Sequence, residues 1–156
     1  MRIREAARAV VLDPDGRILL ASFQFPDKLF WATPGGGLDE GETHEAAVLR
    51  ELAEETGLEN VELGPWIWTR EHIFPFLDGR WDGQAERFAL VRTHRFEPAP
   101  RFTPEQLAAE HVTGLRWWTA AELAASEDRF APSRLPELVA ALLRDGPPAE
   151  PVDVGV

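Results

Sequence analysis

The chain has 156 residues, 44% of them apolar, which is enough to bury one sizeable core. Its 27 acidic and 16 basic side chains give a formal net charge of -11. This charge disfavours a nucleic-acid polymer as partner, and it repels a small phosphorylated molecule unless a divalent cation mediates. The absence of cysteine excludes disulfide bonds and thiolate zinc sites.

The N-terminal stretch "MRIREAARAVVLD" does not have the pattern of a secretory signal, because charged residues interrupt its apolar part. No run in the chain approaches the roughly 18 apolar residues of a membrane span. We therefore expect a cytoplasmic protein without a membrane partner.

The first half of the chain predicts a hairpin, an irregular segment and a helix. In "AARAVVLDPDGRILLASF", two apolar runs flank Asp13-Pro14-Asp15-Gly16, a combination typical of a β-turn. The next stretch, "FPDKLFWATPGGGLDEGE", contains three consecutive glycines and is predicted to be irregular. Residues 43–56 contain no glycine or proline, and Gly57 follows where a helix C-cap belongs, so a helix is predicted there.

The second half predicts strands followed by two helices. Strands are expected in "VELGPWIWTREHIF", "RFALVRTHRF" and "LRWW". Thr119 and Glu122 form the pattern of a capping box, and the amphipathic stretch "SRLPELVAALLRDG" predicts a last helix ending at Gly146. We expect one layered α/β or α+β domain over residues 1–146 and a mobile tail over residues 147–156.

The predicted central helix carries three glutamates on one side. At about 100° per residue, Glu55 lies about 40° and Glu54 about 60° from Glu51. Each such pair of like charges costs an isolated helix about 0.2–0.5 kcal/mol, so stability alone does not explain the arrangement. A glutamate-rich face is often only a solvated surface, and composition does not decide between these interpretations. The other face is apolar and is predicted to face the core: Ala46, Leu49, Leu52 and Ala53.

The context of these glutamates resembles the Nudix box. In that pattern a glycine, five free positions, a glutamate and seven free positions precede Arg-Glu-aliphatic-x-Glu-Glu-x-Gly-aliphatic. The stretch from Gly36 to Leu58 fills every specified position, including Glu42 and the run "RELAEETGL". Weaker similarity extends to "FWATPGGG" before the box and to "LRWWTAAEL" near the C-terminal end.

The resemblance implies a fold and a metal site. The fold is a Nudix-type α/β/α sandwich with a mixed sheet, in which a loop–helix–loop carries the box. The metal ligands implied are Glu51, Glu54 and Glu55, joined by the backbone carbonyl of Gly35 or Gly36. The cation implied is Mg²⁺, for which Mn²⁺ can substitute, and hard cations of this kind do prefer clustered oxygen ligands.

The activity implied is hydrolysis of a phosphoanhydride bond in a nucleoside diphosphate derivative. The substrate classes are a nucleoside triphosphate, an oxidised nucleotide, ADP-ribose, a nucleotide sugar or a dinucleoside polyphosphate. Within the box, Arg50 is expected to hold neighbouring carboxylates in orientation, and direct contact with a substrate phosphate is the alternative. Glu42 is expected to have a structural role.

The general base is not fixed by the pattern. We rank Glu51 or Glu54 first, then Glu110, then Glu86 at the start of a predicted strand. The position that is acidic in many relatives falls on His111, which departs from the family pattern. That histidine is therefore a further alternative, either as a neutral base or as a ligand.

Substrate contacts outside the box are harder to predict. Trp66 is a candidate for stacking on a base and Arg70 for contact with a phosphate, although most aromatic residues must belong to the core. Two other protein classes remain in play, a non-catalytic nucleotide-binding Nudix module and an acidic calcium-binding scaffold. Homodimerisation is also left open by the sequence.

Overall fold

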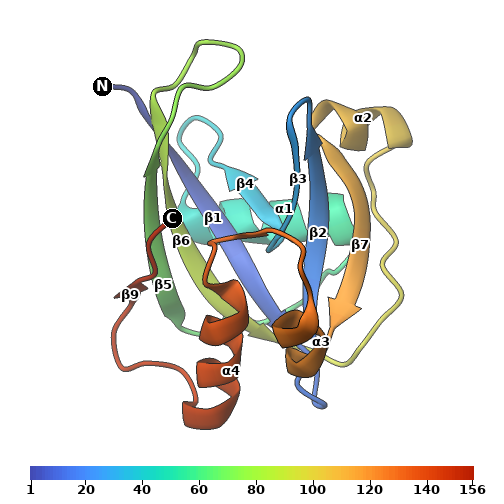
Figure 1. The fold of residues 1–156 in the computed structure, drawn as a ribbon. Coiled ribbons are helices and arrows are strands. Elements are labelled where there is room, and N and C mark those ends of the chain that lie inside the picture. Colours follow the sequence, from blue (N-terminus) through green and yellow to red (C-terminus); the bar gives the residue numbers. More distant parts are fainter.

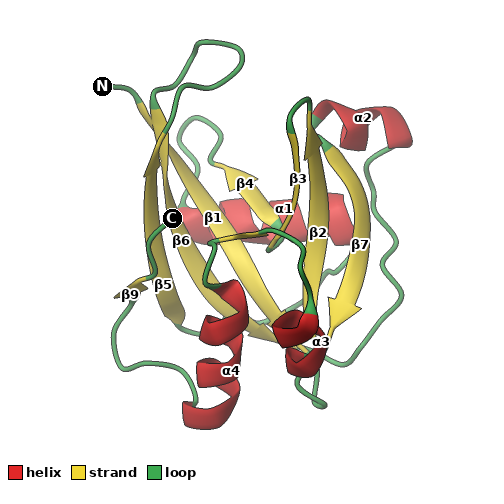
Figure 2. Ribbon diagram, in the orientation of Figure 1, coloured by secondary structure: helices red, strands yellow, loops and turns green.

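A computed structural model describes residues 1–156 as one mixed nine-stranded sheet with four helices (Figures 1 and 2). None of the helices is long and apolar enough to cross a membrane. The strands are β1 (Ile3–Leu12), β2 (Ile18–Phe25), β3 (Lys28–Ala32), β4 (Gly35–Gly37), β5 (Trp66–Ile73), β6 (Gly83–Arg92), β7 (Val112–Trp118), β8 (Phe130–Ala131) and β9 (Val152–Asp153). The helices are α1 (His44–Thr56), α2 (Pro104–Ala109), α3 (Ala120–Ala125) and α4 (Leu135–Asp145).

The centre of the sheet is the parallel pair β1 and β6. The full path is β8-β3-β2-β1-β6-β5-β9, with β7 paired to β2 and the short β4 paired to β1. The antiparallel pairing of β4 with β1 places Gly36 opposite Ala7 and Gly35 opposite Arg8. The three glycines that precede α1 are therefore held against the central strand.

Strand alternation divides the core into two layers. Ala7, Ala9 and Val11 of β1 face one side, where they cluster with buried residues of α1. Val10 and Leu12 face the other side, where they cluster with buried residues of α3 and α4. Figure 2 shows α1 behind the sheet and α3 and α4 in front of it. This arrangement confirms the predicted α/β/α sandwich.

The predicted hairpin and helices are present, and their local signals act as expected. Gly16 in the first turn has a φ of 82°. Thr43 caps α1 by accepting a hydrogen bond from the N–H of Ala46, and Gly57 ends the helix with a φ of 80°. The capping box predicted before α3 is formed, and α4 ends before Gly146.

Three segments differ from the prediction. Residues 28–32 and 35–37 are strands rather than irregular chain, because β2 and β1 supply their hydrogen-bonding partners. Helix α2 was not anticipated, although Thr103 opens it with a capping box. The tail predicted to be mobile is docked instead. Its β9 pairs with β5, and the side chain of Val154 is buried in the core at 2% exposure.

Candidate metal and substrate site

The glycines of β4 bring backbone and carboxylates into contact. The N–H of Gly35 donates to Oε2 of Glu55 at 3.2 Å. A Cβ atom on Gly36 would lie 2.7 Å from Oε1 of Glu51, and one on Gly35 would lie 2.3 Å from the carbonyl oxygen of Ala7. Only glycine allows these approaches, so the run positions the backbone directly against the glutamates of α1.

Two of the box glutamates are buried together. Glu51 is 9% exposed and Glu55 is 2% exposed. Burial, the charge of Glu51 and a hydrogen bond between the two side chains raise the pKa of Glu55 well above its ordinary value. The arrangement is electrostatically unfavourable when both groups are ionised, and a nearby cation would relieve it.

Arg50 donates hydrogen bonds to three of the four glutamates that the box specifies. Its Nε and Nη2 donate to the two carboxylate oxygens of Glu42, each at 2.9 Å, and its Nη2 also donates to the carbonyl of Gly37 at 3.1 Å. Its Nη1 donates to Glu51 and to Glu54, both at 3.1 Å. This geometry fits the expected role of Arg50 in orienting carboxylates.

The oxygen donors suit a hard divalent cation. Glu51 and Glu55 meet beside the backbone of Gly35 and Gly36, as the residue pattern requires. No group of three or more histidine or acidic side chains surrounds one metal position in the structure. Glu54, the third expected ligand, accepts a hydrogen bond from Arg50. Burial and the charge of Glu51 raise the pKa of Glu54.

Glu86 lies in a buried ion-pair network across the sheet, and Arg8 of this network also acts electrostatically on Glu55 and Glu51 of the box. Arg8 of β1 pairs with its Oε2, and Arg70 of β5 donates to its Oε1 at 2.6 Å. Arg8 also donates to the carbonyl of Thr33 at 3.0 Å. Burial raises the pKa of Glu86, but the charges of Arg8 and Arg70 outweigh burial and hold this pKa below its ordinary value. Both oxygens of this candidate base are thus engaged.

Arg4 and Glu110 extend the site beyond the box. A Cβ atom on Gly37 would meet the guanidinium of Arg4, which therefore lies against the last residue of β4. Burial and the charge of Arg8 lower the pKa of Arg4, while the charges of Glu110 and Glu51 act in the opposite direction. Arg4 thus lies within electrostatic reach of both a box glutamate and the exposed Glu110 at the end of α2.

The structure does not bring Trp66 to this site. Trp66 packs with the core layer of α1. Its ring meets the ring of His44 edge-on, with a distance of 6.2 Å between the ring centroids. The reason is an irregularity in the β5–β6 pairing between Trp66 and Trp68, which turns Trp66 to the opposite face from Arg70. Its packing gives no support to the prediction that Trp66 stacks on a base.

Sequence reasoning missed Arg4 and Arg8. Both belong to an N-terminal strand that is otherwise largely apolar, and Arg8 stands in its middle. A charge inside a central strand is costly to bury unless it is paired, and this signal could have marked Arg8 as part of a buried network.

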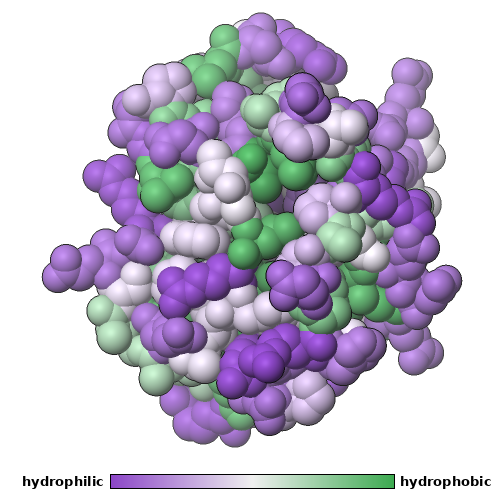
Figure 3. Space-filling model, turned by 90° about the vertical axis from the view of Figure 1, so that its right-hand side faces the viewer, coloured by the Kyte–Doolittle hydropathy of each residue, from purple (hydrophilic) through white to green (hydrophobic).

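A sizeable cavity lies elsewhere. It has a volume of about 390 Å³ and lies beside β7, where Pro98, Pro100 and Leu115 are among its lining residues. Figure 3 shows that apolar residues on this side of the molecule are surrounded by hydrophilic ones. None of the box glutamates lines this cavity, so we do not assign it to the candidate site.

The fold and the loop–helix–loop together define a domain of the Nudix type. A family model of the NUDIX domain matches residues 2–140, and the chain therefore belongs to the NUDIX family. This match confirms the family prediction that rested on the box.

Relatives by sequence carry enzyme names. The chain is 33% identical over 96 residues to the RNA pyrophosphohydrolase of Wolbachia pipientis subsp. Culex pipiens (strain wPip), covering 57% of this chain and 59% of that protein. It is 29% identical over 132 residues to the RNA pyrophosphohydrolase of Roseobacter denitrificans, covering 77% of this chain and 79% of that protein. A third match, to the Sulfurovum protein of the same name, is 43% identical and spans 43% of that relative.

Solved structures share the fold. The MutT NUDIX hydrolase from Burkholderia pseudomallei superposes with a TM-score of 0.61 at 26% identity, covering 87% of this chain and 96% of that one. The NUDIX domain of Shewanella oneidensis NrtR, complexed with ADP ribose, gives a TM-score of 0.66 at 20% identity, covering 92% of this chain and 90% of that one. The names of the enzyme relatives agree with the prediction of a hydrolase that acts on anhydride bonds.

Proposed function

We propose that the protein is a divalent-metal-dependent pyrophosphohydrolase that cleaves a phosphoanhydride bond in a small nucleotide. The observation that carries this proposal is the meeting of Glu51 and Glu55 against Gly35 and Gly36 within a complete Nudix box. Clustered carboxylates held against backbone form an oxygen-rich site, and family membership supports its use in hydrolysis.

Glu51 and Glu55 would hold Mg²⁺ or Mn²⁺, with Glu54 as the third carboxylate and the Gly35 or Gly36 carbonyl as a backbone ligand. When bound, the cation supplies positive charge to phosphate oxygens and lowers the pKa of a water molecule. Arg50 holds Glu51 and Glu54 in place through hydrogen bonds of 3.1 Å.

In the reaction, the oxygen of water forms a bond to phosphorus while the bond between phosphorus and the bridging oxygen breaks. We assign Glu54 as the group that takes the proton of this water, because it is partly exposed and burial raises its pKa towards neutrality. Glu110 is the second choice because it is exposed and acts on the same Arg4 as Glu51. Glu86 is the weakest candidate because two arginines already bind it.

The substrate is proposed to be a small nucleotide rather than RNA. The relatives are named for RNA, but the net charge of -11 opposes an extended phosphate backbone. Hydrolysis of a nucleoside triphosphate and of a 5′-triphosphorylated RNA of about twenty nucleotides can be compared at equal ionic strength. A higher kcat/KM for the RNA would contradict this choice. The cytoplasmic location and homodimerisation stay predictions from sequence.

The central test uses Glu54→Gln and Glu55→Gln. A panel of nucleoside diphosphate derivatives is incubated with Mg²⁺ or Mn²⁺, and the products are identified. We expect EDTA to abolish hydrolysis and each variant to lose about 10²–10⁴-fold in kcat, the usual range when a proton acceptor or a metal contact is removed. Glu45→Gln is the matched control, since Glu45 is exposed in the first turn of the same helix. Full activity in both glutamine variants would exclude the assigned site.

A second candidate function is a nucleotide-binding module without catalysis. The fold is shared with the NUDIX domain from Shewanella oneidensis that was solved in complex with ADP ribose, and this likeness is the observation that favours the second candidate. Calorimetric titration with ADP-ribose and with nucleoside triphosphates in the presence of Mg²⁺ decides between the two. Tight binding without any product would favour the module over the enzyme.

A further inference from the structure

Arg70 on β5 has a hydrogen-bond donor to spare. Its side chain is 9% exposed, and its Nη1 donates to Glu86 at 2.6 Å. The Nε–H group is buried and has no partner in the protein. A buried donor without an acceptor is energetically unfavourable, so a ligand that supplies an acceptor provides the hydrogen bond that the folded protein lacks.

His72, two residues further along the strand, supplies a second donor. Its Nδ1 faces Nη2 of Arg70 at 3.4 Å, and because a guanidinium has only donors, Nδ1 must be the accepting nitrogen. Burial and the positive charges of Arg70 and Lys28 lower the pKa of His72, which favours the neutral ring. A neutral ring that accepts at Nδ1 carries its proton on Nε2.

Flat side chains accompany these donors. The ring centroids of His72 and Phe74 lie 4.5 Å apart. Phe74 stacks on Phe76 with a centroid distance of 5.0 Å and an interplanar angle of 12°. Such a surface suits the face of an aromatic ligand, since offset stacking is favourable for most planar rings.

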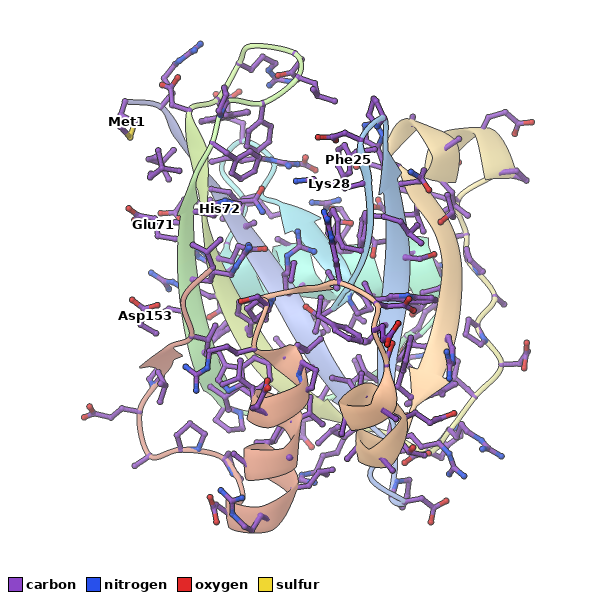
Figure 4. The ribbon with its side chains drawn as sticks, viewed as in Figure 1. Met1, Phe25, Lys28, Glu71, His72 and Asp153 are labelled. Atoms are coloured by element: carbon purple, nitrogen blue, oxygen red, sulfur yellow. The ribbon has the colours of Figure 1, made fainter.

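The β2–β3 hairpin faces these residues with an aromatic cluster and a cation. Phe25 stacks on His111 at 4.3 Å, and the ammonium of Lys28 lies over Phe25 at 5.8 Å. In Figure 4, Phe25 and Lys28 point from this hairpin towards His72, whereas Glu71 points away from it. The influence of Lys28 on the pKa of His72 places the two hairpins within electrostatic reach.

The side-chain acceptors beside Arg70 and His72 on β5 and β6 are already bound. The only carboxylate among these groups, Glu86, has both oxygens bound by Arg8 and Arg70. The amide oxygen of Gln84 accepts a hydrogen bond from Arg4 at 3.3 Å. On β5 and β6 the donors of Arg70 and His72 are therefore left for a ligand, and Lys28 adds a donor from the facing hairpin.

We propose that Arg70 and His72, with Lys28 on the facing hairpin, recognise the base of the substrate and select a base that presents a carbonyl oxygen over one that presents an amino group. This inference rests on the proposed function for the assumption that the substrate is a nucleotide. An oxo base places an acceptor at the free donors, whereas an amino group would leave them unpaired.

Inosine 5′-monophosphate and adenosine 5′-monophosphate test this choice, because their bases differ in an oxo or an amino group at C6, with the neighbouring N1 a donor in inosine and an acceptor in adenosine. Neither contains an anhydride bond, so binding is measured by titration calorimetry with Mg²⁺ and without turnover. We expect the inosine nucleotide to bind at least about tenfold more tightly. Equal affinities, a preference for the adenosine nucleotide, or no measurable binding of the inosine nucleotide would overturn the proposal.

His72→Phe keeps a flat ring but removes the N–H donor, and it should reduce the preference at least threefold. Lys28→Met, on the exposed hairpin, should also reduce it without a change in the core. Glu71→Gln is the matched control, because Glu71 lies between Arg70 and His72 and is exposed on the other face. A preference unchanged in both His72→Phe and Lys28→Met would contradict the assignment. A preference found in a protein without hydrolase activity would refute the proposed function and leave this inference standing.

Discussion

Two arginine–carboxylate networks in this protein differ in what their carboxylates can still do. In the network of Arg50, the arginine side chain is 26% exposed and bonds to Glu42, Glu51 and Glu54. In the network of Glu86, the carboxylate is 2% exposed, and Arg8 and Arg70 each take one oxygen. One arginine thus serves several acids, whereas in the other network one acid is bound by two arginines.

The ratio of charges explains the difference in function that we propose. Around Arg50 the acids outnumber the cation, so carboxylate oxygens remain for a metal ion and a water molecule. Around Glu86 the cations outnumber the acid, and the spare donors of Arg70 are left for a substrate. The box pattern includes Arg50 but contains no position for Glu86, Arg8 or Arg70, so it describes only the first of these two environments.

Arg8→Met gives the largest expected change in stability. The variant keeps most of the side-chain length but leaves Glu86 buried with one partner fewer, which typically costs about 3–5 kcal/mol in the free energy of unfolding. Urea denaturation followed by tryptophan fluorescence measures this cost. Arg144→Met is the control, since Arg144 pairs with Asp145 on the surface at 70% exposure and its loss should leave the urea midpoint almost unchanged. Similar costs for the two variants would show that burial does not distinguish the networks.

The pH dependence of stability should have opposite signs for Glu86 and Glu55. The pKa of Glu86 is held below its ordinary value by Arg8 and Arg70 against the effect of burial, so its stabilisation is complete above the unfolded pKa and is lost as pH falls through the folded pKa. Burial and Glu51 raise the pKa of Glu55, so its contribution is lost as pH rises through the folded value. Denaturation of the metal-free protein between pH 3 and pH 8 tests both directions. Relative to the unaltered protein, Glu86→Gln should lose the acid-side dependence and Glu55→Gln should lose the alkaline-side dependence.

The sequence predicted those features whose causes are local. The helix over residues 43–56 follows from its caps and from the absence of glycine and proline, and the first turn follows from Asp13 to Gly16. The box spacing predicted that Glu51 and Glu55 lie side by side, and they do so because residues four apart share one helix face.

Features that depend on distant partners could not be predicted in this way. Arg8 and Glu86 are 78 residues apart in the chain and meet only because β1 and β6 pair in parallel. The packing of Trp66 could not be predicted because a single irregularity in β5 reverses the face of its side chain. The tail was misjudged because Val154 is buried by packing on β5 and the core rather than by any pattern of its own.

Arg50→Lys tests the network of Arg50 in the same way. The expected change in the free energy of unfolding is smaller than for Arg8→Met. A lysine keeps the positive charge but offers one nitrogen in place of a planar guanidinium, so it cannot bond Glu42 through two nitrogens while also holding Glu51 and Glu54. We expect kcat to fall about tenfold, which corresponds to about 1.4 kcal/mol at the transition state. The free energy of unfolding should fall by less than in Arg8→Met, because this network is partly solvated. Steady-state kinetics and urea denaturation of the same preparations measure both quantities. A loss of stability as large as that of Arg8→Met, with unchanged kcat, would mean that Arg50 supports the fold rather than orienting the carboxylates of the site.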